Sequence, residues 1–207
     1  MNVGIGVELG CIVFAGIGLL EQRYAEEPER AALDYDMQLQ WVLSEGFPAA
    51  RLTTEALTSA GWDVDILIAH NPALSQQWAS QVGIPYTTES TVLMEQLASI
   101  RPDVTFFLEP SLVSTELAQA IRRVTNLLVL RLDYAAPASA ALGSVDLIVS
   151  ASASQVHELR ERGYPAHYLP HGSQSVQSEF TTRSSSGGVH ILTAFSEHDE
   201  ASRKAVE

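Results

Sequence analysis

The amino-acid sequence predicts an α/β fold: a Rossmann-like parallel sheet with helices on both faces. Two observations support this prediction. Short runs of Val, Ile, Leu and Phe alternate along the chain with longer segments whose apolar residues recur at helical spacing. These runs are mostly apolar and do not alternate regularly with polar residues, which indicates strands buried on both faces. Such strands occur in parallel sheets that are covered by two layers of helices.

The first half of the chain should open with a strand over Cys11–Ala15. The charged stretch Glu21–Asp36 predicts a loop or an irregular helix. Met37–Ser59 has helical spacing, but a glycine and a proline interrupt it, so it predicts two helices. Three further elements are expected: a strand over Val64–Ala69, a helix over Ala73–Val82 with Pro72 in its first turn, and a helix over Ser90–Ile100.

The second half of the chain continues the alternation of strands and helices. Between the last two apolar runs, a Ser-rich turn can cap a helix that ends at Gly163. The predicted strands cover Val104–Leu108, Leu127–Leu130, Leu147–Val149 and Ala166–Leu169, and the predicted helices cover Ser111–Arg123 and Val156–Arg162.

The domain organisation follows from length and local composition. A chain of 207 residues fits one domain plus the start of another. Ser173–Gly188 is rich in Ser, Thr, Gln and Gly, which is typical of a linker. We therefore expect a Rossmann-like domain over residues 1–172, a linker over 173–188, and a remnant of a second domain over 189–207 that begins with the strand Val189–Phe195.

Composition excludes several classes of function. The formal net charge is −13 and basic residues are few, which argues against a nucleic-acid-binding surface. The single cysteine, Cys11, excludes an internal disulfide and a multi-cysteine metal site. His167 and His171 have no third ligand at a suitable spacing, so we expect no metal. The fingerprints of dinucleotide binding, phosphate-binding loops, serine hydrolases and zinc proteases are missing, and no cofactor is expected.

The apolar N-terminus could be mistaken for a targeting or membrane segment. Met1–Leu20 has no Lys or Arg, whereas a signal peptide needs a positive start. Glu8 and five glycines interrupt the stretch, which disfavours a membrane span. A buried strand followed by a glycine turn explains it better, so we expect a cytoplasmic protein without a membrane span.

Candidate site residues follow from one rule: in an open parallel sheet, ligands bind at the carboxyl ends of the strands. Two carboxylates there, Glu109 and Asp133, are the candidate general bases for a hydroxyl group. Each also has a structural alternative, as a helix-entry carboxylate or as the loop partner of Arg131. The candidate substrate-binding residues at this edge are Gly16, Gly18, His70, Asn71, Arg131, Ser150, Ser152 and His171. Asn71 has a structural alternative as the cap of the next helix.

Several segments, taken in order, resemble one family. Asp146–Gly172 combines an Asp-led strand, a Ser turn, a helix ending in Arg-Gly, and a final Leu-Pro-His-Gly. With these segments the chain resembles the CgeB-type (spore maturation protein-like) GT-B glycosyltransferases over most of its length. The other segments that carry the resemblance are Tyr35–Ala60, Gly61–Gly83, Arg101–Leu108 and Val189–Glu207.

The resemblance implies a glycosyltransferase that moves a sugar from a nucleotide-sugar donor to an acceptor hydroxyl. In this family the N-terminal domain holds mainly the acceptor, and the donor binds mainly through the C-terminal domain. The chain carries only the start of that second domain, so this polypeptide alone is expected to be inactive. Two alternatives stay open: a non-catalytic α/β binding or regulatory domain, and a domain like that of a sugar-nucleotide epimerase.

Overall fold

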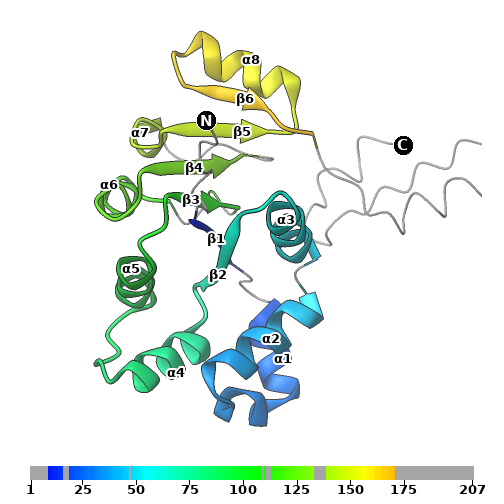
Figure 1. Cartoon of the computed structure of the whole chain (residues 1–207), viewed down its shortest axis with the longest axis vertical. Coiled ribbons are helices and arrows are strands. Elements are labelled where there is room, and N and C mark those ends of the chain that lie inside the picture. Colours follow the sequence, from blue (N-terminus) through cyan, green and yellow to red (C-terminus); the bar gives the residue numbers. More distant parts are fainter. Residues whose placement is uncertain are drawn as a thin grey trace, which may run out of the picture. The chain divides into compact units, whose positions relative to one another are not determined.

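The computed structural model describes residues 9–15, 19–46, 48–108, 110, 113–132 and 139–170. Within these residues the chain forms one six-stranded sheet in which all neighbouring strands are parallel (Figure 1). The predicted α/β fold with a parallel sheet is therefore confirmed. The strands are β1 (Leu9–Ala15), β2 (Asp63–Ala69), β3 (Val104–Phe107), β4 (Leu127–Arg131), β5 (Leu147–Ser150) and β6 (Ala166–Tyr168).

The strand order is β2-β1-β3-β4-β5-β6, so the chain reverses its direction across the sheet once. It steps from β1 outward to β2, then crosses back to place β3 on the other side of β1. The carboxyl ends of β1 and β3 flank this switch point, which is where open α/β sheets bind ligands. β2 is left as an edge strand that pairs with β1 alone.

Helices cover both faces of the sheet, as the sequence predicts. On β2, alternate side chains enter two different apolar clusters, which identifies the two faces. The helices are α1 (Leu19–Glu26), α2 (Tyr35–Gly46), α3 (Pro48–Ser59), α4 (Pro72–Val82), α5 (Glu89–Ile100), α6 (Thr115–Ile121), α7 (Ser139–Leu142) and α8 (Ala153–Glu161), with a 3₁₀ helix, η1, over Pro28–Ala32.

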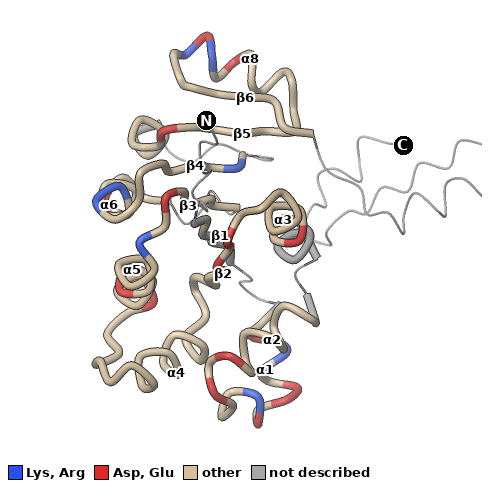
Figure 2. Tube along the Cα trace, viewed as in Figure 1, with Lys and Arg blue, Asp and Glu red and all other residues tan. Residues whose placement is uncertain are grey.

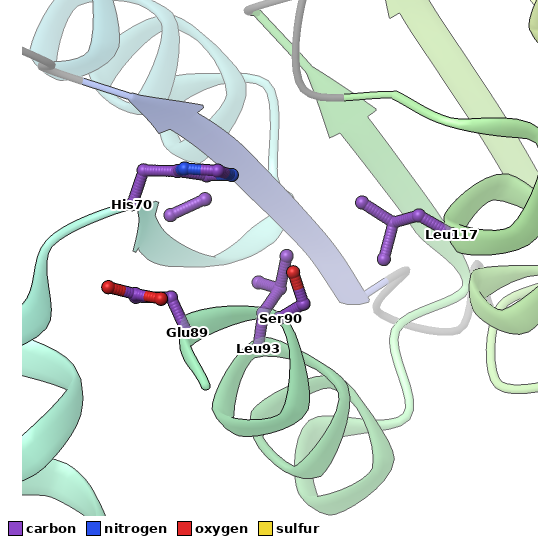
Figure 3. A pocket seen from close by; sticks show the side chains of 6 residues that line it. His70, Glu89, Ser90, Leu93 and Leu117 are labelled. Atoms are coloured by element: carbon purple, nitrogen blue, oxygen red, sulfur yellow. The ribbon is translucent and has the colours of Figure 1, made fainter. Parts of the chain in front are cut away.

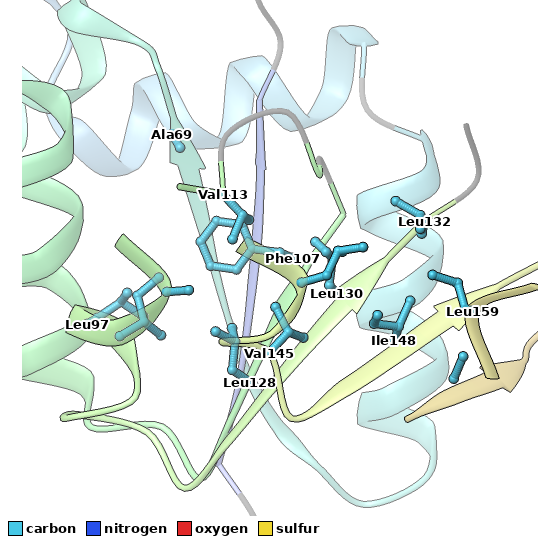
Figure 4. Close-up of a cluster of buried hydrophobic side chains, with 14 of the residues drawn as sticks. Ala69, Leu97, Phe107, Val113, Leu128, Leu130, Leu132, Val145, Ile148 and Leu159 are labelled. Carbon is cyan, nitrogen blue, oxygen red and sulfur yellow. The ribbon is translucent and has the colours of Figure 1, made fainter. Parts of the chain in front are cut away.

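The larger apolar cluster lies between β2–β6 and the helices α5 to α8 (Figure 4). Leu97 of α5, Phe107 of β3 and Leu130 of β4 are fully buried in it. The smaller cluster joins the other face of β2 to α1, α2 and α4 through Trp41, Ile68 and their neighbours. Burying such side chains contributes about 1.5–3 kcal/mol each. The larger cluster therefore fixes the sheet, whereas the smaller one attaches the N-terminal helices to its edge.

The Asp-led strand of the resembling segment has a structural role. One carboxylate oxygen of Asp146 accepts a hydrogen bond from the Leu128 amide at 2.9 Å, and the other pairs with Arg122 at 2.8 Å. Asp146 thus joins the start of β5 to the start of β4 and to the end of α6. At the end of the segment, Gly163 has a φ of 83°, which a glycine adopts without steric cost as the helix ends.

The structure decides one open alternative and departs from the sequence prediction at two other places. The charged stretch after β1 folds as α1 and η1, which agrees with the irregular helix and not with the loop. The helix predicted over Ser111–Arg123 begins only at Thr115, because Ser114 has an extended backbone and its hydroxyl accepts a hydrogen bond from Leu117 N at 3.1 Å. The four-residue helix α7 was not predicted, since so short a segment shows no periodicity.

The predicted linker and the strand Val189–Phe195 lie outside the described residues. None of the described helices is long and apolar enough to cross a membrane.

Candidate functional site

The chain leaves β2 through a strained residue. His70 follows the strand directly and has a φ of 56°, in the left-handed region that residues with a side chain seldom adopt. Arg101 is the other described non-glycine residue with a positive φ. Holding His70 in this conformation costs on the order of 1–3 kcal/mol, so the surrounding structure must enforce it. Outliers of this kind concentrate at functional sites.

The residue after His70, Asn71, helps to hold this backbone conformation. Asn71 is almost fully buried and caps α4, its side-chain oxygen accepting a hydrogen bond from Leu74 N at 3.1 Å. Its amide nitrogen donates to the Tyr24 hydroxyl at 3.4 Å, which in turn donates to Gln38 Oε1 at 2.9 Å. The Gln38 amide then donates to two carbonyl oxygens of the segment around η1, those of Ala31 and Leu33. This buried chain of hydrogen bonds ties the exit of β2 to α1 and α2.

Burial of the network affects the pKa of Tyr24, which supplies its phenol. Desolvation raises the pKa of Tyr24 above its ordinary value, and the hydrogen bond from Asn71 partly opposes this. Tyr24 also packs edge-on against Trp41, with ring centroids 5.0 Å apart. The predicted role of Asn71 as a helix cap is therefore what the structure describes, and its side chain is occupied within the fold.

His70 lines a shallow depression at the carboxyl end of β2 (Figure 3). Glu89 and Ser90 reach this depression from the first turn of α5. Leu93 of α5 and Leu117 of α6 form its apolar part, together with Ala69. Residues separated by a whole helix in sequence thus meet at the edge where ligands bind in parallel sheets.

The carboxylate of Glu89 lies at the start of α5, next to the phenol of Tyr86. Thr88 caps α5 by accepting a hydrogen bond from Thr91 N at 3.2 Å, which places Glu89 in the first turn, where the helix dipole favours a negative charge. Desolvation, the charge of Glu89 and a hydrogen bond to Glu89 all raise the pKa of Tyr86, so the phenol stays protonated beside the carboxylate.

These groups give the depression a mixed hydrogen-bonding character. The imidazole of His70 can donate and accept, the carboxylate of Glu89 accepts, and the hydroxyl of Ser90 does both. A sugar or another polyol presents hydroxyl groups that also do both. An imidazole or a carboxylate at this position can also take a proton from a bound hydroxyl. The depression is shallow, so it can contact only one side of a ligand.

Two of the predicted serines lie at a separate part of the sheet edge. Ser150 ends β5 and is buried, donating to Gln155 Oε1 at 2.7 Å and accepting from Ser152 N at 3.0 Å. Ser152 caps α8, with its hydroxyl 3.3 Å from Gln155 N. Both side chains therefore stabilise the turn between β5 and α8.

The structure does not bring the two groups of predicted residues together. β2 and β5 are separated by four strand spacings, each of about 4.8 Å, so His70 and Ser150 lie roughly 19 Å apart across the sheet. One sugar ring cannot contact both. Arg131, at the end of β4, lies between them and is half-buried. The other predicted residues, Gly16, Gly18, Glu109, Asp133 and His171, lie outside the described residues.

Sequence reasoning did not select Glu89, Ser90 or Tyr86. The rule of strand ends directs attention to the residue after each strand, whereas these three follow the helix α4. The one available signal was the Thr88 cap, which marks the start of α5 and so places a carboxylate in its first turn.

No cluster of three or more His, Cys, Asp or Glu side chains suited to a metal ion occurs in the described ranges. Acidic positions occur on β2 and along the N-terminal helices, and arginines occur at the ends of β4, α6 and α8 as well as in the N-terminal helices (Figure 2). No family model matches the chain, and no curated protein or solved structure matches it significantly.

Proposed function

We propose that this domain is the acceptor-binding half of a GT-B glycosyltransferase, which transfers a sugar from a nucleotide-sugar donor to an acceptor hydroxyl. The observation that carries the proposal is the depression in which His70 and Glu89 meet at the carboxyl end of a parallel sheet. Its mixed donors and acceptors suit a hydroxylated ligand. The family resemblance supports the same function.

In this proposal, His70, Glu89 and Ser90 orient the acceptor. Glu109 and Asp133, which follow β3 and β4 in the sequence, are the proposed general bases that take the proton of the attacking hydroxyl. The donor's phosphates need positive charge or helix N-termini, which the acceptor side with its net negative charge does not have to supply.

The test is an NMR titration of the isotope-labelled chain with methyl glycosides of glucose, galactose and N-acetylglucosamine. At least one glycoside should shift the amide signals of residues 70, 89 and 90. His70→Ala and Glu89→Gln should each weaken its binding about tenfold, the loss expected for one hydrogen bond to a charged or polar partner. Matched controls are His157→Ala on α8 and Glu95→Gln on α5, which are exposed and do not line the depression.

UDP-glucose should leave these signals unchanged, because the donor is expected to bind mainly elsewhere. Saturable shifts of residues 70, 89 and 90 by UDP-glucose would favour the epimerase-like alternative instead. If none of the glycosides shifts these signals, or the control variants lose binding as much as the site variants, the proposal is wrong.

A further inference from the structure

A second hollow lies along the outer edge of β2, away from the depression at its carboxyl end. This edge groove, as we call it, has a cavity volume of about 370 Å³. Its floor is the strand segment Val64–Leu67, its walls come from α2 and from the last turns of α5, and Trp78 of α4 closes it. Figure 1 shows β2 at the border of the sheet with these helices around it. The volume lies in the range of small-molecule sites.

The floor of the edge groove offers unpaired backbone groups. β2 pairs with β1 on one side only, so alternate carbonyl and amide groups point away from the sheet. In the described part of the chain, no hydrogen bond other than those to β1 reaches the backbone of Val64–Leu67. A ligand in the groove can therefore bond to the strand itself.

The walls add a further acceptor, the side-chain oxygen of Gln96. Gln96 is 5% exposed, and its amide nitrogen donates to the Tyr35 hydroxyl at 3.0 Å. Within the described residues this is the single hydrogen bond of the Gln96 side chain, so its side-chain oxygen remains an acceptor without a partner. This oxygen is not fully buried, so a ligand can reach it from the groove that Gln96 lines.

Asp65 supplies a carboxylate that no cation of the described chain neutralises. Desolvation raises its pKa, and the neighbouring charge of Asp63 raises it further. Asp36 of α2 adds a second carboxylate to the rim, and none of the residues lining the edge groove is Lys, Arg or His. The groove is thus rich in acceptors and negative charge, and its lining has no cationic side chain.

Aromatic and aliphatic surface fills the rest of the edge groove. The rings of Trp78 and Tyr35 line it together with Leu39, Ile66 and Ile100. The face of an indole attracts a cation as well as apolar carbon. Trp78 is half-buried at this wall.

We infer that the edge groove binds a small primary amine with an apolar body. The ammonium group has three donors and no acceptor, which matches the Asp65 carboxylate, the Gln96 side-chain oxygen and a free carbonyl of β2. The apolar body packs between α2 and α5 against Trp78. A second copy of the chain is a poorer occupant, since pairing β2 with β2 would bring Asp63 and Asp65 close to like charges.

The experiment is an NMR titration of the labelled chain with three probes of similar shape: tryptamine, 3-methylindole and indole-3-propionate. Tryptamine should give saturable shifts at residues 65, 66 and 96 and at the Trp78 indole. We expect neutral 3-methylindole to bind about tenfold more weakly, because it lacks the charged hydrogen bonds, and the anion to bind more weakly still.

Substitutions of single residues test where tryptamine binds. Asp65→Asn should weaken tryptamine binding about tenfold, whereas Asp63→Asn should change it about twofold or less, since a screened charge outside the groove contributes little. The two substitutions remove the same charge from the same strand, but only Asp65 lines the groove. Gln96→Glu should strengthen binding. The inference is overturned if tryptamine shows no saturable shifts, if indole-3-propionate binds as well, or if Asp63→Asn weakens binding as much as Asp65→Asn.

Discussion

At the carboxyl end of β2, His70 and Glu89 line a shallow depression that has both donors and acceptors. Asp65, which lies earlier on β2, and Gln96, which lies later on α5, line a larger groove that is rich in acceptors. The same strand and the same helix build both sites. The difference arises because the two sites use different parts of the strand. The depression lies at the end of β2, where a turn is exposed, and the groove lies along its edge, where backbone groups and one row of side chains are exposed. One β-α layer can therefore present two chemically distinct surfaces.

The two sites are also supported differently. The depression depends on a buried network that runs from Asn71 through Tyr24 to Gln38, and on a backbone conformation that is unfavourable for a histidine. The edge groove depends on the unpaired edge of β2 and on exposed carboxylates, with walls from α2 and α5. Replacing His70 should therefore affect the depression and not the groove, whereas removing the charge of Asp65 should affect the groove, and predictions below test that separation.

The largest effect is expected from Asn71→Ala. Losing a helix cap costs about 1 kcal/mol, and leaving its buried partners unsatisfied costs about as much again, so the free energy of unfolding should fall by about 2 kcal/mol. Urea denaturation measures this. The exposed cap variant Thr88→Ala should cost about 1 kcal/mol or less. Equal losses for the two variants would show that the buried network adds nothing beyond capping.

His70→Gly should separate stability from binding at the depression. Glycine adopts a positive φ without the steric cost of a side chain, so the substitution should relieve the strain and raise the free energy of unfolding by about 1 kcal/mol. The greater conformational entropy that glycine gives the unfolded chain reduces this gain. Binding of the responsive glycoside should weaken at the same time, while tryptamine binding stays unchanged. Destabilisation by this substitution would mean that the imidazole makes contacts that outweigh the strain.

The smallest effect concerns the charge of Asp65. A carboxyl group whose pKa is raised on folding contributes stability at pH below its unfolded pKa and loses it as pH rises through the folded pKa. At pH 7 the charged form is therefore slightly unfavourable, and Asp65→Asn should stabilise the chain by a few tenths of a kcal/mol, since the group is largely exposed. Tryptamine binding should weaken as the pH falls through this pKa. Binding that is independent of pH from 3 to 7 would contradict the role of Asp65.

Most of the fold could be predicted from the sequence because its signals are local. The apolar runs identify the strands, and residues such as Pro72 and Gly163 mark where helices start and stop. The start of α6 was missed because Ser114 caps the helix from an extended backbone, so α6 begins four residues later than the apolar pattern suggests. The strand order could not be deduced, since it depends on how helices pack over the whole sheet.

The sites were less predictable for the same reason. His70 follows a strand and could be selected, but Glu89 reaches it only because α4 and the turn after it fold back. The edge groove requires β2 to be the terminal strand, which no local pattern of residues reveals. Asn71 and Ser152 were predicted both as ligand-binding residues and as helix caps, and the structure describes them as caps.

The most direct test of the separation between the two sites is a competition titration followed by NMR. The labelled chain is saturated with the glycoside that shifts residues 70, 89 and 90, and tryptamine is then added. We predict that tryptamine shifts residues 65, 66 and 96 with the same affinity as in the free chain, and that the glycoside shifts persist. Displacement of the glycoside by tryptamine, or one common set of shifted residues, would show that the two surfaces form a single site.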